Sequence, residues 1–280
     1  MLDGTENVII GNGSSVVYDN IFRMFLEPGD EVIQHTPCFG IYKLRGTILG
    51  GKMVSVPMVY KDKYLHFDTD AILIAITDKT KIIVVANLNN PSGNFMETKD
   101  ILRIAETRIP FVIDDAYVAY AGLSKSYTYL TKKYKNVIIT CTLSKAYGLA
   151  GMRFGYALAD KEVIAQISGA LLPWNVGTIP LWAALAAFED TEALAERVKF
   201  NNDAVDFIAT ELRKVPGLVV IFCSIVAQLV KKASKSLHMQ NPRVLYYDPI
   251  LKNMVLMLGS VLPLVPKKKI KWSLMLSQNS

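Results

Sequence analysis

The stretch KIIVVANLNNPSG, residues 81–93, decides the fold class of this 280-residue chain. After Lys81 the stretch is apolar for five residues, and a loop rich in Asn, Pro and Gly follows. In a parallel sheet that helices cover on both faces, a strand is a continuous apolar run of this kind. A strand with one face in solvent instead alternates apolar and polar residues. The run NVIIT, residues 136–140, has the same character. The chain is therefore predicted to be α/β, with a mostly parallel sheet flanked by helices.

Outward from this stretch, short β-type runs alternate with helical stretches up to about residue 160. Ser14 and Ser15 are expected to cap a helix, and the pattern degrades beyond Pro216. We expect a large domain over residues 1–190 and a smaller, incomplete α+β domain over residues 191–280. Strands are predicted at residues 31–35, 81–86, 110–113 and 136–141, and helices at residues 97–106, 180–189 and 196–212.

The bulk composition is that of a globular, enzyme-sized protein. Hydrophobic residues make up 51% of the chain, and the net charge is +6. Part of that charge lies in a lysine-rich run at residues 267–271. We interpret this run as a solvated tail, because no aromatic platform for bases accompanies it. No nucleic-acid partner is therefore expected.

Cysteines, histidines and apolar runs bear on location and metal content. Three cysteines are too few and too scattered for a disulfide framework, and the three histidines form no metal-ligand cluster. We therefore expect a reducing, cytoplasmic setting and no metal. The opening MLDGTENVIIGNG has neither a basic start nor a long apolar core, so no signal peptide is expected. The longest apolar run, residues 218–230, is interrupted by Ser224 and Gln228 and is too short to span a membrane.

Several polar segments lie where a predicted strand ends or a loop follows one, and that edge of an open parallel sheet binds ligands. GNGSSVVYDN, residues 11–20, offers N–H groups, hydroxyls and the positive end of a helix to a phosphate, although a turn with a helix cap would look the same. NLNNPSG, residues 87–93, is either a plain loop or a source of amides for a ligand's oxygen. FVIDDAYVAY, residues 111–120, places Asp114 at a strand end and Tyr117 three residues on. A helix cap or an internal salt bridge is the alternative there.

The segment TLSKAYGLAGMRFGYA, residues 142–157, puts Lys145 and Arg153 eight positions apart among small and apolar residues. A lysine taken at random is a surface residue, but here Thr142 and Ser144 are small donors and the glycines permit close backbone approach. The arginine supplies a rigid fork of donors for an anion. Together the segments hold a lysine for a Schiff base, an acid for a ring nitrogen, and donors for a ring oxygen and a phosphate. That is a full set of partners for pyridoxal phosphate.

The order and spacing of these segments resemble the fold-type I, or class I and II, pyridoxal-phosphate aminotransferases, and most closely histidinol-phosphate aminotransferase. The resemblance implies amino transfer between an amino acid or amino-alcohol phosphate and a 2-oxo acid, as in the histidinol-phosphate/2-oxoglutarate reaction of histidine biosynthesis. It also implies a homodimer. It covers residues 5 to about 215 and rests on ENVIIGNGSS, FLEPGDEV, TPCFGIY, NLNNPSG, VIDDAYVAY, TLSKAYGLAGMRFGY and LPWNV.

The resemblance also implies roles for particular residues. Lys145 would bind the cofactor's aldehyde and then remove the substrate's Cα proton, Asp114 would pair with the ring nitrogen, and Tyr117 would complete the catalytic set. The other expected contacts are Asn90 with Tyr117 at the phenolic oxygen, Phe39 on the ring face, Ser14, Ser15, Thr142 and Arg153 at the phosphate, and Asn175 on the substrate side.

Two departures from the family pattern leave alternatives open. The family's N-terminal segment, which carries a tyrosine for the partner's cofactor phosphate, has no counterpart before Met1. Val255 or Leu256 stands where a small-domain arginine would hold the substrate carboxylate. The chain is therefore expected to be truncated at its N-terminus and irregular at its C-terminus. An aromatic aminotransferase, a threonine-phosphate decarboxylase and a catalytically impaired homologue remain as alternatives.

Overall fold

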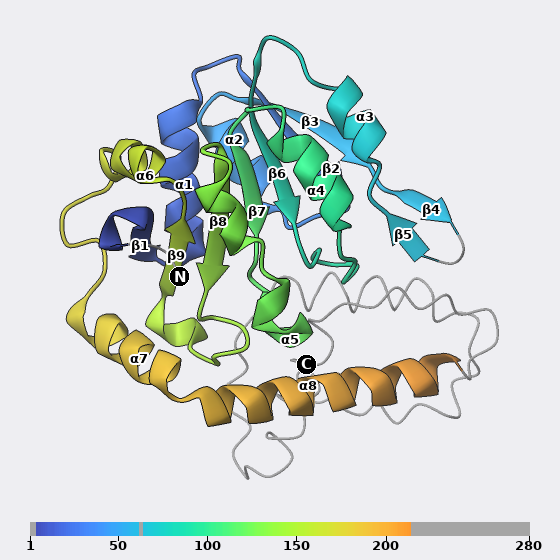
Figure 1. Ribbon diagram of the computed structural model, residues 1–280, viewed down its shortest axis with the longest axis vertical. Coiled ribbons are helices and arrows are strands. Elements are labelled where there is room, and N and C mark those ends of the chain that lie inside the picture. Colours follow the sequence, from blue (N-terminus) through green and yellow to red (C-terminus); the bar gives the residue numbers. More distant parts are fainter. Residues whose placement is uncertain (1–3, 62–63, 214–280) are drawn as a thin grey trace, which may run out of the picture. The chain divides into compact units, whose positions relative to one another are not determined.

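The computed structural model describes residues 4–61 and 64–213, and its centre is a seven-stranded sheet (Figure 1). The strand order is β1-β9-β8-β7-β6-β2-β3. Five neighbouring strands, β8 to β3 in that order, are parallel, and β9 runs antiparallel to both of its neighbours. The predicted, mostly parallel α/β sheet is thus confirmed. The strands are β1 (Val8–Asn12), β2 (Glu31–Thr36), β3 (Lys52–Pro57), β6 (Thr80–Ala86), β7 (Phe111–Asp114), β8 (Val137–Thr142) and β9 (Phe154–Leu158).

Helices and a short hairpin complete the described part of the chain. The α-helices are α1 (Ser14–Phe25), α2 (Ile41–Ile48), α3 (Thr69–Ile74), α4 (Thr98–Ala105), α5 (Val118–Ala121), α6 (Lys161–Ser168), α7 (Thr178–Glu189) and α8 (Thr191–Arg213). The hairpin pairs β4 (Val59–Lys61) with β5 (Tyr64–His66), and the 3-10 helices are η1 (Thr5–Asn7), η2 (Leu123–Lys125), η3 (Thr128–Lys132) and η4 (Ala150–Met152).

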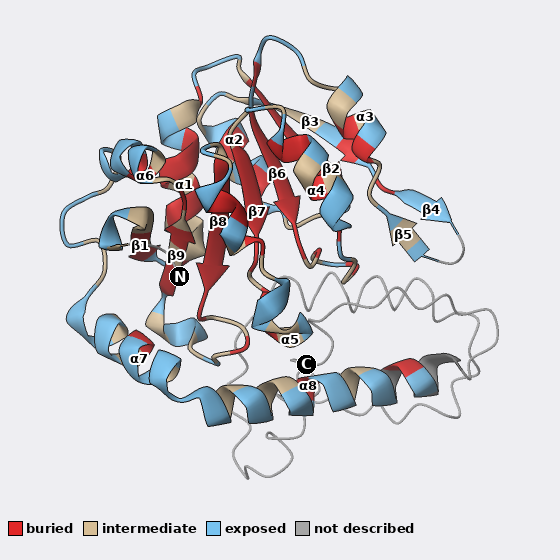
Figure 2. Ribbon diagram, viewed as in Figure 1, coloured by how far each residue is buried: buried red, intermediate tan, exposed pale blue. Residues whose placement is uncertain are grey.

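The continuous apolar runs arise because the central strands are buried on both faces. In β6, Ile82 and Val84 join a core cluster with α1 and α6, whereas Ile83 and Val85 join a second cluster with α3 and α4. β7 and β8 consist entirely of buried residues. Figure 2 shows the burial of these central strands. Alternate residues of one strand thus anchor two separate helical layers, as the sequence pattern predicts.

The predicted elements agree with the observed ones to within two residues, except that α8 begins five residues before its predicted start, and one correction applies at the start of α1. Ser14 and Ser15 do not cap this helix, because they are its first two residues and Gly13 is the N-cap. Gly13 has φ 80°, a left-handed conformation that glycine adopts without the steric cost of a Cβ. The backbone therefore turns into α1 at a glycine, and both serines present their N–H groups at the open end of the helix.

The predicted domain boundary falls at the short connection between α7 and α8, at Asp190. Most of the expected smaller domain, from residue 214 onward, lies outside the described residues, as do Val255 and Leu256. The division into residues 1–190 and 191–280 therefore stays a prediction. In the described ranges, no helix combines the length and the apolar character that crossing a bilayer requires.

Candidate active site

The carboxyl ends of the central parallel strands bring the predicted site residues to one edge of the sheet. Asp114 is the last residue of β7, and it lies opposite Ala86 of β6 and Thr140 of β8 in the strand register. Tyr117 follows β7 in a tight turn, and Lys145 follows β8. Residues from the connections that follow two neighbouring strands therefore lie at the end of the sheet where open parallel sheets bind their ligands.

Asp114 is buried and accepts hydrogen bonds from its own turn and from α2. Tyr42 Oη donates to its carboxylate at 2.5 Å, and the Ala116 N–H donates at 3.0 Å. Burial raises the pKa of Asp114, whereas the hydrogen bonds and the positive charge of Lys145 oppose that rise. A further cation placed against this carboxylate would stabilise its ionised form, because a nearby positive charge offsets the cost of burying a negative one.

Lys145 and Tyr117 face each other beside this carboxylate. The Lys145 Nζ lies 5.2 Å from the centroid of the Tyr117 ring, within the range of a cation–π contact. Tyr117 is buried, and Lys145 is half-buried. The lysine is thus held near an aromatic face and an acid, and it does not extend freely into solvent.

Arg153 lies at the N-terminal end of α1. Its guanidinium donates to Ser144 Oγ at 3.4 Å and to the Ala150 carbonyl at 3.0 Å, and a Cβ added to Gly13 would clash with that guanidinium. A Cβ added to Gly155 would lie 2.6 Å from the Gly13 carbonyl carbon, so β9 approaches the start of α1 very closely. Free N–H groups at the end of a helix beside an arginine form a ready anion site.

The anion site and the lysine are adjacent, because Ser144 and Lys145 are neighbours in the chain. The Ser144 N–H donates to Thr142 Oγ1 at 3.2 Å. The Thr142 hydroxyl in turn donates to the Phe154 carbonyl at 3.3 Å, directly after Arg153. The loop after β8 therefore places the amine and the arginine around one region of the sheet edge.

The other predicted contacts differ in how closely the structure links them to this centre. The Phe39 ring lies 6.0 Å from the ring of Tyr42, the residue that holds Asp114. Asn90 is half-buried in the loop after β6. Asn175 donates its amide to the Ile10 carbonyl at 3.0 Å. That bond ties the loop before α7 to β1.

Sequence reasoning missed two tyrosines behind Asp114. Tyr42 binds the carboxylate directly, and Tyr18 hydrogen-bonds Thr140 and packs edge-on against Tyr42 with ring centroids 5.2 Å apart. A signal for Tyr42 existed, because it lies three residues after Phe39 in TPCFGIY, the segment from which Phe39 was predicted to cover the ring. Tyr18 lies inside an amphipathic helix, where an aromatic residue reads as ordinary core.

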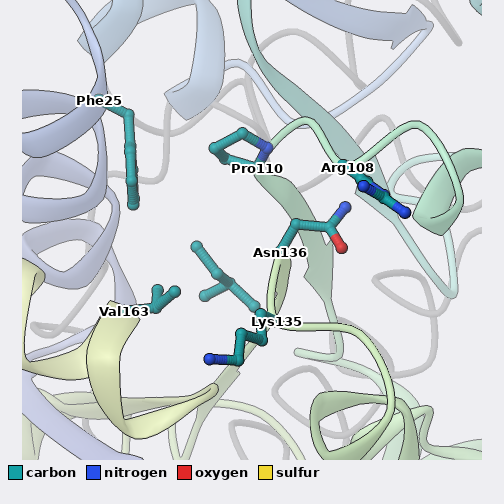
Figure 3. Close-up of a pocket in the computed structure, with 7 residues that line it drawn as sticks. Phe25, Arg108, Pro110, Lys135, Asn136 and Val163 are labelled. Atoms are coloured by element: carbon teal, nitrogen blue, oxygen red, sulfur yellow. The ribbon is translucent and has the colours of Figure 1, made fainter.

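A cavity of about 220 Å³ lies at the opposite edge of the sheet (Figure 3). Pro110 and Asn136, which line it, stand directly before β7 and β8, at the amino ends of those strands. The remaining lining residues are Phe25, Arg108, Lys135, Ile138 and Val163. This cavity is separate from the groups around Lys145.

The fold and the arrangement at its carboxyl edge define the class of the protein: it has the fold of the pyridoxal-phosphate-dependent aminotransferases. An aspartate aminotransferase variant of Thermus thermophilus superimposes with a TM-score of 0.71 and 27% identity, over 79% of this chain and 63% of that one. Histidinol-phosphate aminotransferase of Sinorhizobium meliloti, solved in complex with pyridoxal-5'-phosphate, gives 0.69 and 25% identity, over 75% and 57%.

The chain belongs to the family of class I and II aminotransferases, whose model matches residues 2–227. Histidinol-phosphate aminotransferase of Methanocaldococcus jannaschii is 35% identical over 217 residues, which cover 77% of this chain and 58% of the relative. Histidinol-phosphate aminotransferase 1 of Bacillus cereus is 39% identical over 207 residues, covering 71% and 54%. The family resemblance predicted from sequence is confirmed, and the chain spans somewhat more than half the length of these curated relatives.

Proposed function

We propose that this chain binds pyridoxal phosphate and takes part in amino transfer of the histidinol-phosphate/2-oxoglutarate type, as in histidine biosynthesis. The observation that carries the proposal is the meeting of Lys145, Asp114 and an arginine-lined helix end at one edge of the sheet. The names of the two relatives above support the choice of substrate class.

The residues present fit this cofactor. The glycines at 13 and 155 leave room where a side chain would clash, and the buried Asp114 benefits from a cationic partner such as a protonated ring nitrogen. Free N–H groups and Arg153 suit a phosphate dianion. In the proposed arrangement Ser14, Ser15, Thr142 and Arg153 hold the phosphate, Tyr117 and Asn90 hold the ring oxygen, Phe39 covers the ring, Lys145 binds the aldehyde and Asn175 lines the substrate side.

When bound, the cofactor supplies an electron sink for a carbanion at the substrate's Cα. Once the substrate's amine has displaced it from the aldehyde, the Lys145 amine would take the Cα proton and deliver a proton to the cofactor's aldehyde carbon, and it would act in the reverse direction in the second half of the reaction. Asp114 stays ionised against the cofactor's cation, and Tyr42 fixes the orientation of that carboxylate through its 2.5 Å hydrogen bond. The Tyr117 ring lies against the lysine and limits the directions in which the amine can move.

The central test is spectroscopic. Addition of pyridoxal phosphate to the purified chain should give the absorbance band of the lysine-linked cofactor near roughly 420 nm, and addition of an amino donor should remove it. Lys145→Ala should abolish the band. Lys135→Ala is the matched control, because Lys135 is exposed and pairs only with Glu162 among the described residues. A band of unchanged intensity in Lys145→Ala would refute the role assigned to this lysine.

Product analysis separates this reaction from its neighbours on the same scaffold. A keto product formed from histidinol phosphate supports the proposal, and keto products from aromatic amino acids point to a sister aminotransferase. Release of carbon dioxide from a threonine phosphate points to a decarboxylase. A stable cofactor band with no product from any donor identifies a chain that binds the cofactor without turnover.

We further propose a homodimer, a cytoplasmic location and no nucleic-acid partner. α7 supports the dimer, because its apolar side chains Ile179 and Trp182 are 73% and 68% exposed in the described structure, and exposed apolar patches commonly mark protein interfaces. Cys38 and Cys141 are free thiols, which suits a reducing compartment. Analytical ultracentrifugation should give twice the chain mass, and Trp182→Lys should shift that mass toward the monomer.

A further inference from the structure

His35 and Asn89 form a buried pair between strand β2 and the loop that follows β6. His35 is the next-to-last residue of β2, and Asn89 lies in the loop after β6. Both are 1% exposed, and His35 Nε2 lies 2.9 Å from Asn89 Oδ1. Asn89 is thus anchored to a different strand of the sheet by a side-chain contact.

The chemistry of the neighbours fixes which atoms donate. Asn89 Nδ2 faces the Pro37 carbonyl at 3.1 Å and Ser92 Oγ at 2.7 Å, and a carbonyl can only accept, so the amide nitrogen must lie on that side. The Oδ1 therefore faces the imidazole, and His35 must donate from Nε2. Burial lowers the pKa of His35 to about 4, so the ring keeps this neutral form at physiological pH.

The same asparagine also closes its own loop through the backbone. The Asn89 N–H donates to the Asn94 carbonyl at 2.8 Å, and the Gly93 N–H donates to the Asn89 carbonyl at 2.7 Å. Side chain and backbone together bind Asn89 to β2, to the loop after β2 and to the turn that follows Asn89 itself. Asn90 is the next residue, so its position is set by a neighbour that cannot shift alone.

We propose that His35 and Asn89 are positioning residues, which hold the Asn90 amide at the cofactor's ring oxygen and the Phe39 ring against the cofactor's ring face. The Asn89 amide binds the Pro37 carbonyl, which belongs to the loop that carries Phe39. Asn90 is joined to Asn89 directly by a peptide bond. This inference rests on the proposed function, because the ring it positions is that of pyridoxal phosphate.

The test measures the pH midpoint at which the absorbance band of the lysine-linked cofactor changes. A hydrogen bond from Asn90 to the ring oxygen competes with the imine proton for that oxygen and so favours the proton-free form. Asn89→Ala should loosen Asn90 and raise the midpoint by about half a pH unit or more. Asn136→Ala is the matched control, because the Asn136 amide also bridges two carbonyls, of Ala105 and Ile109, at the opposite edge of the sheet.

A second pair of variants tests the histidine. His35→Gln retains a donor for Asn89 and should keep the midpoint close to that of the unaltered chain, whereas His35→Leu loses the donor and should raise it. Where Asn89→Ala does not fold, Ser92→Ala removes one acceptor of the same amide and should still move the midpoint. No band in the unaltered chain would overturn the proposed function. A normal band with the same midpoint in all folded variants would overturn the positioning role alone.

Discussion

His35 couples the stability of the fold to pH. Its pKa is about 4 in the folded chain, because burial disfavours the charged ring, and about 6.5 when unfolded. Between these values the unfolded chain binds more protons, so the stabilising contribution is complete above about pH 6.5 and is lost as the pH falls toward 4. We expect a loss of roughly 3 kcal/mol across that window. Urea unfolding at several pH values measures it.

The His35→Leu variant should unfold with a smaller dependence on pH below 6.5. His66→Gln is the control, because the His66 ring is exposed in the β5 hairpin. A His35→Leu chain that loses stability on acidification as steeply as the unaltered chain would contradict this explanation.

Asp115 should have the opposite dependence. Burial, reinforced by the charge of Asp114, raises its pKa to about 8, although Ser126 Oγ donates to it at 2.5 Å. A raised folded pKa gives stability that is present at low pH and is lost as the pH rises toward 8. Asp115→Asn should therefore stabilise the chain, by about 2 kcal/mol or more at pH 8 and by less at pH 5. Thermal melts at the two pH values measure the gain in stability. An equal gain at pH 5 and pH 8 would contradict the raised pKa of Asp115 as its cause.

At the residue scale, sequence predicted the groups that are chemically out of place and missed those that look ordinary. Lys145 and Arg153 stand among glycines and apolar residues, and Asp114 ends an apolar strand, so each required a partner. His35 lies inside a normal strand, and its partner is 54 positions away. Nothing local indicates such a pair.

At the element scale, the contact between β9 and the start of α1 is the feature that shapes the proposed phosphate site. Gly155→Ala would place a Cβ 2.6 Å from the Gly13 carbonyl carbon, and backbone atoms on both sides leave no flexible group to give way. We expect about 2 kcal/mol of destabilisation from this overpacking and weaker binding of pyridoxal phosphate. Chemical unfolding and a cofactor titration measure the two effects.

Gly151→Ala is the matched control from the same motif. A Cβ at Gly151 would meet no atom within 4 Å, so this substitution should leave both stability and cofactor binding nearly unchanged. Equal effects of the two substitutions would show that the close approach at Gly155 does not matter for the site.

The elements themselves were predictable where burial leaves a pattern, and less so elsewhere. β6, β7 and β8 are covered on both faces, so their apolar runs mark them to within about one residue. β9 was not predicted, because glycine interrupts it and its partner β1 lies near the other end of the described chain. Antiparallel pairing over such a distance has no signature in either segment alone.

At the scale of the whole molecule, the described residues include every residue of this chain that the resemblance assigns to the cofactor. The position at which the family's small-domain arginine would hold the substrate carboxylate, expected at Val255 or Leu256, falls beyond residue 213, and the chain matches little more than half of its relatives. Cofactor binding and substrate turnover are therefore separate proposals for this chain, and the described residues bear on the first of them.

This separation predicts that pyridoxal phosphate stabilises the chain even without substrate. A ligand at 100 times its Kd adds about 2.7 kcal/mol to the free energy of unfolding, which corresponds to several degrees in Tm for a chain of this size. Lys145→Ala should retain part of the shift, because the end of α1 and Arg153 still bind the phosphate. Arg153→Ala should lose more of it. Differential scanning calorimetry with and without the cofactor measures both.

Pyridoxal, which lacks the phosphate, separates the two contributions. Arg153 should contribute to the binding of pyridoxal phosphate and not to that of pyridoxal. The affinity for pyridoxal phosphate, divided by the affinity for pyridoxal, should therefore fall in Arg153→Ala. Arg23→Ala is the control, because Arg23 is an exposed arginine in the last turn of the same helix and pairs with Asp19. If Arg153→Ala weakens both ligands equally, the arginine only supports the fold, and the anion site at the start of α1 must be assigned to Ser14, Ser15 and Thr142 without it.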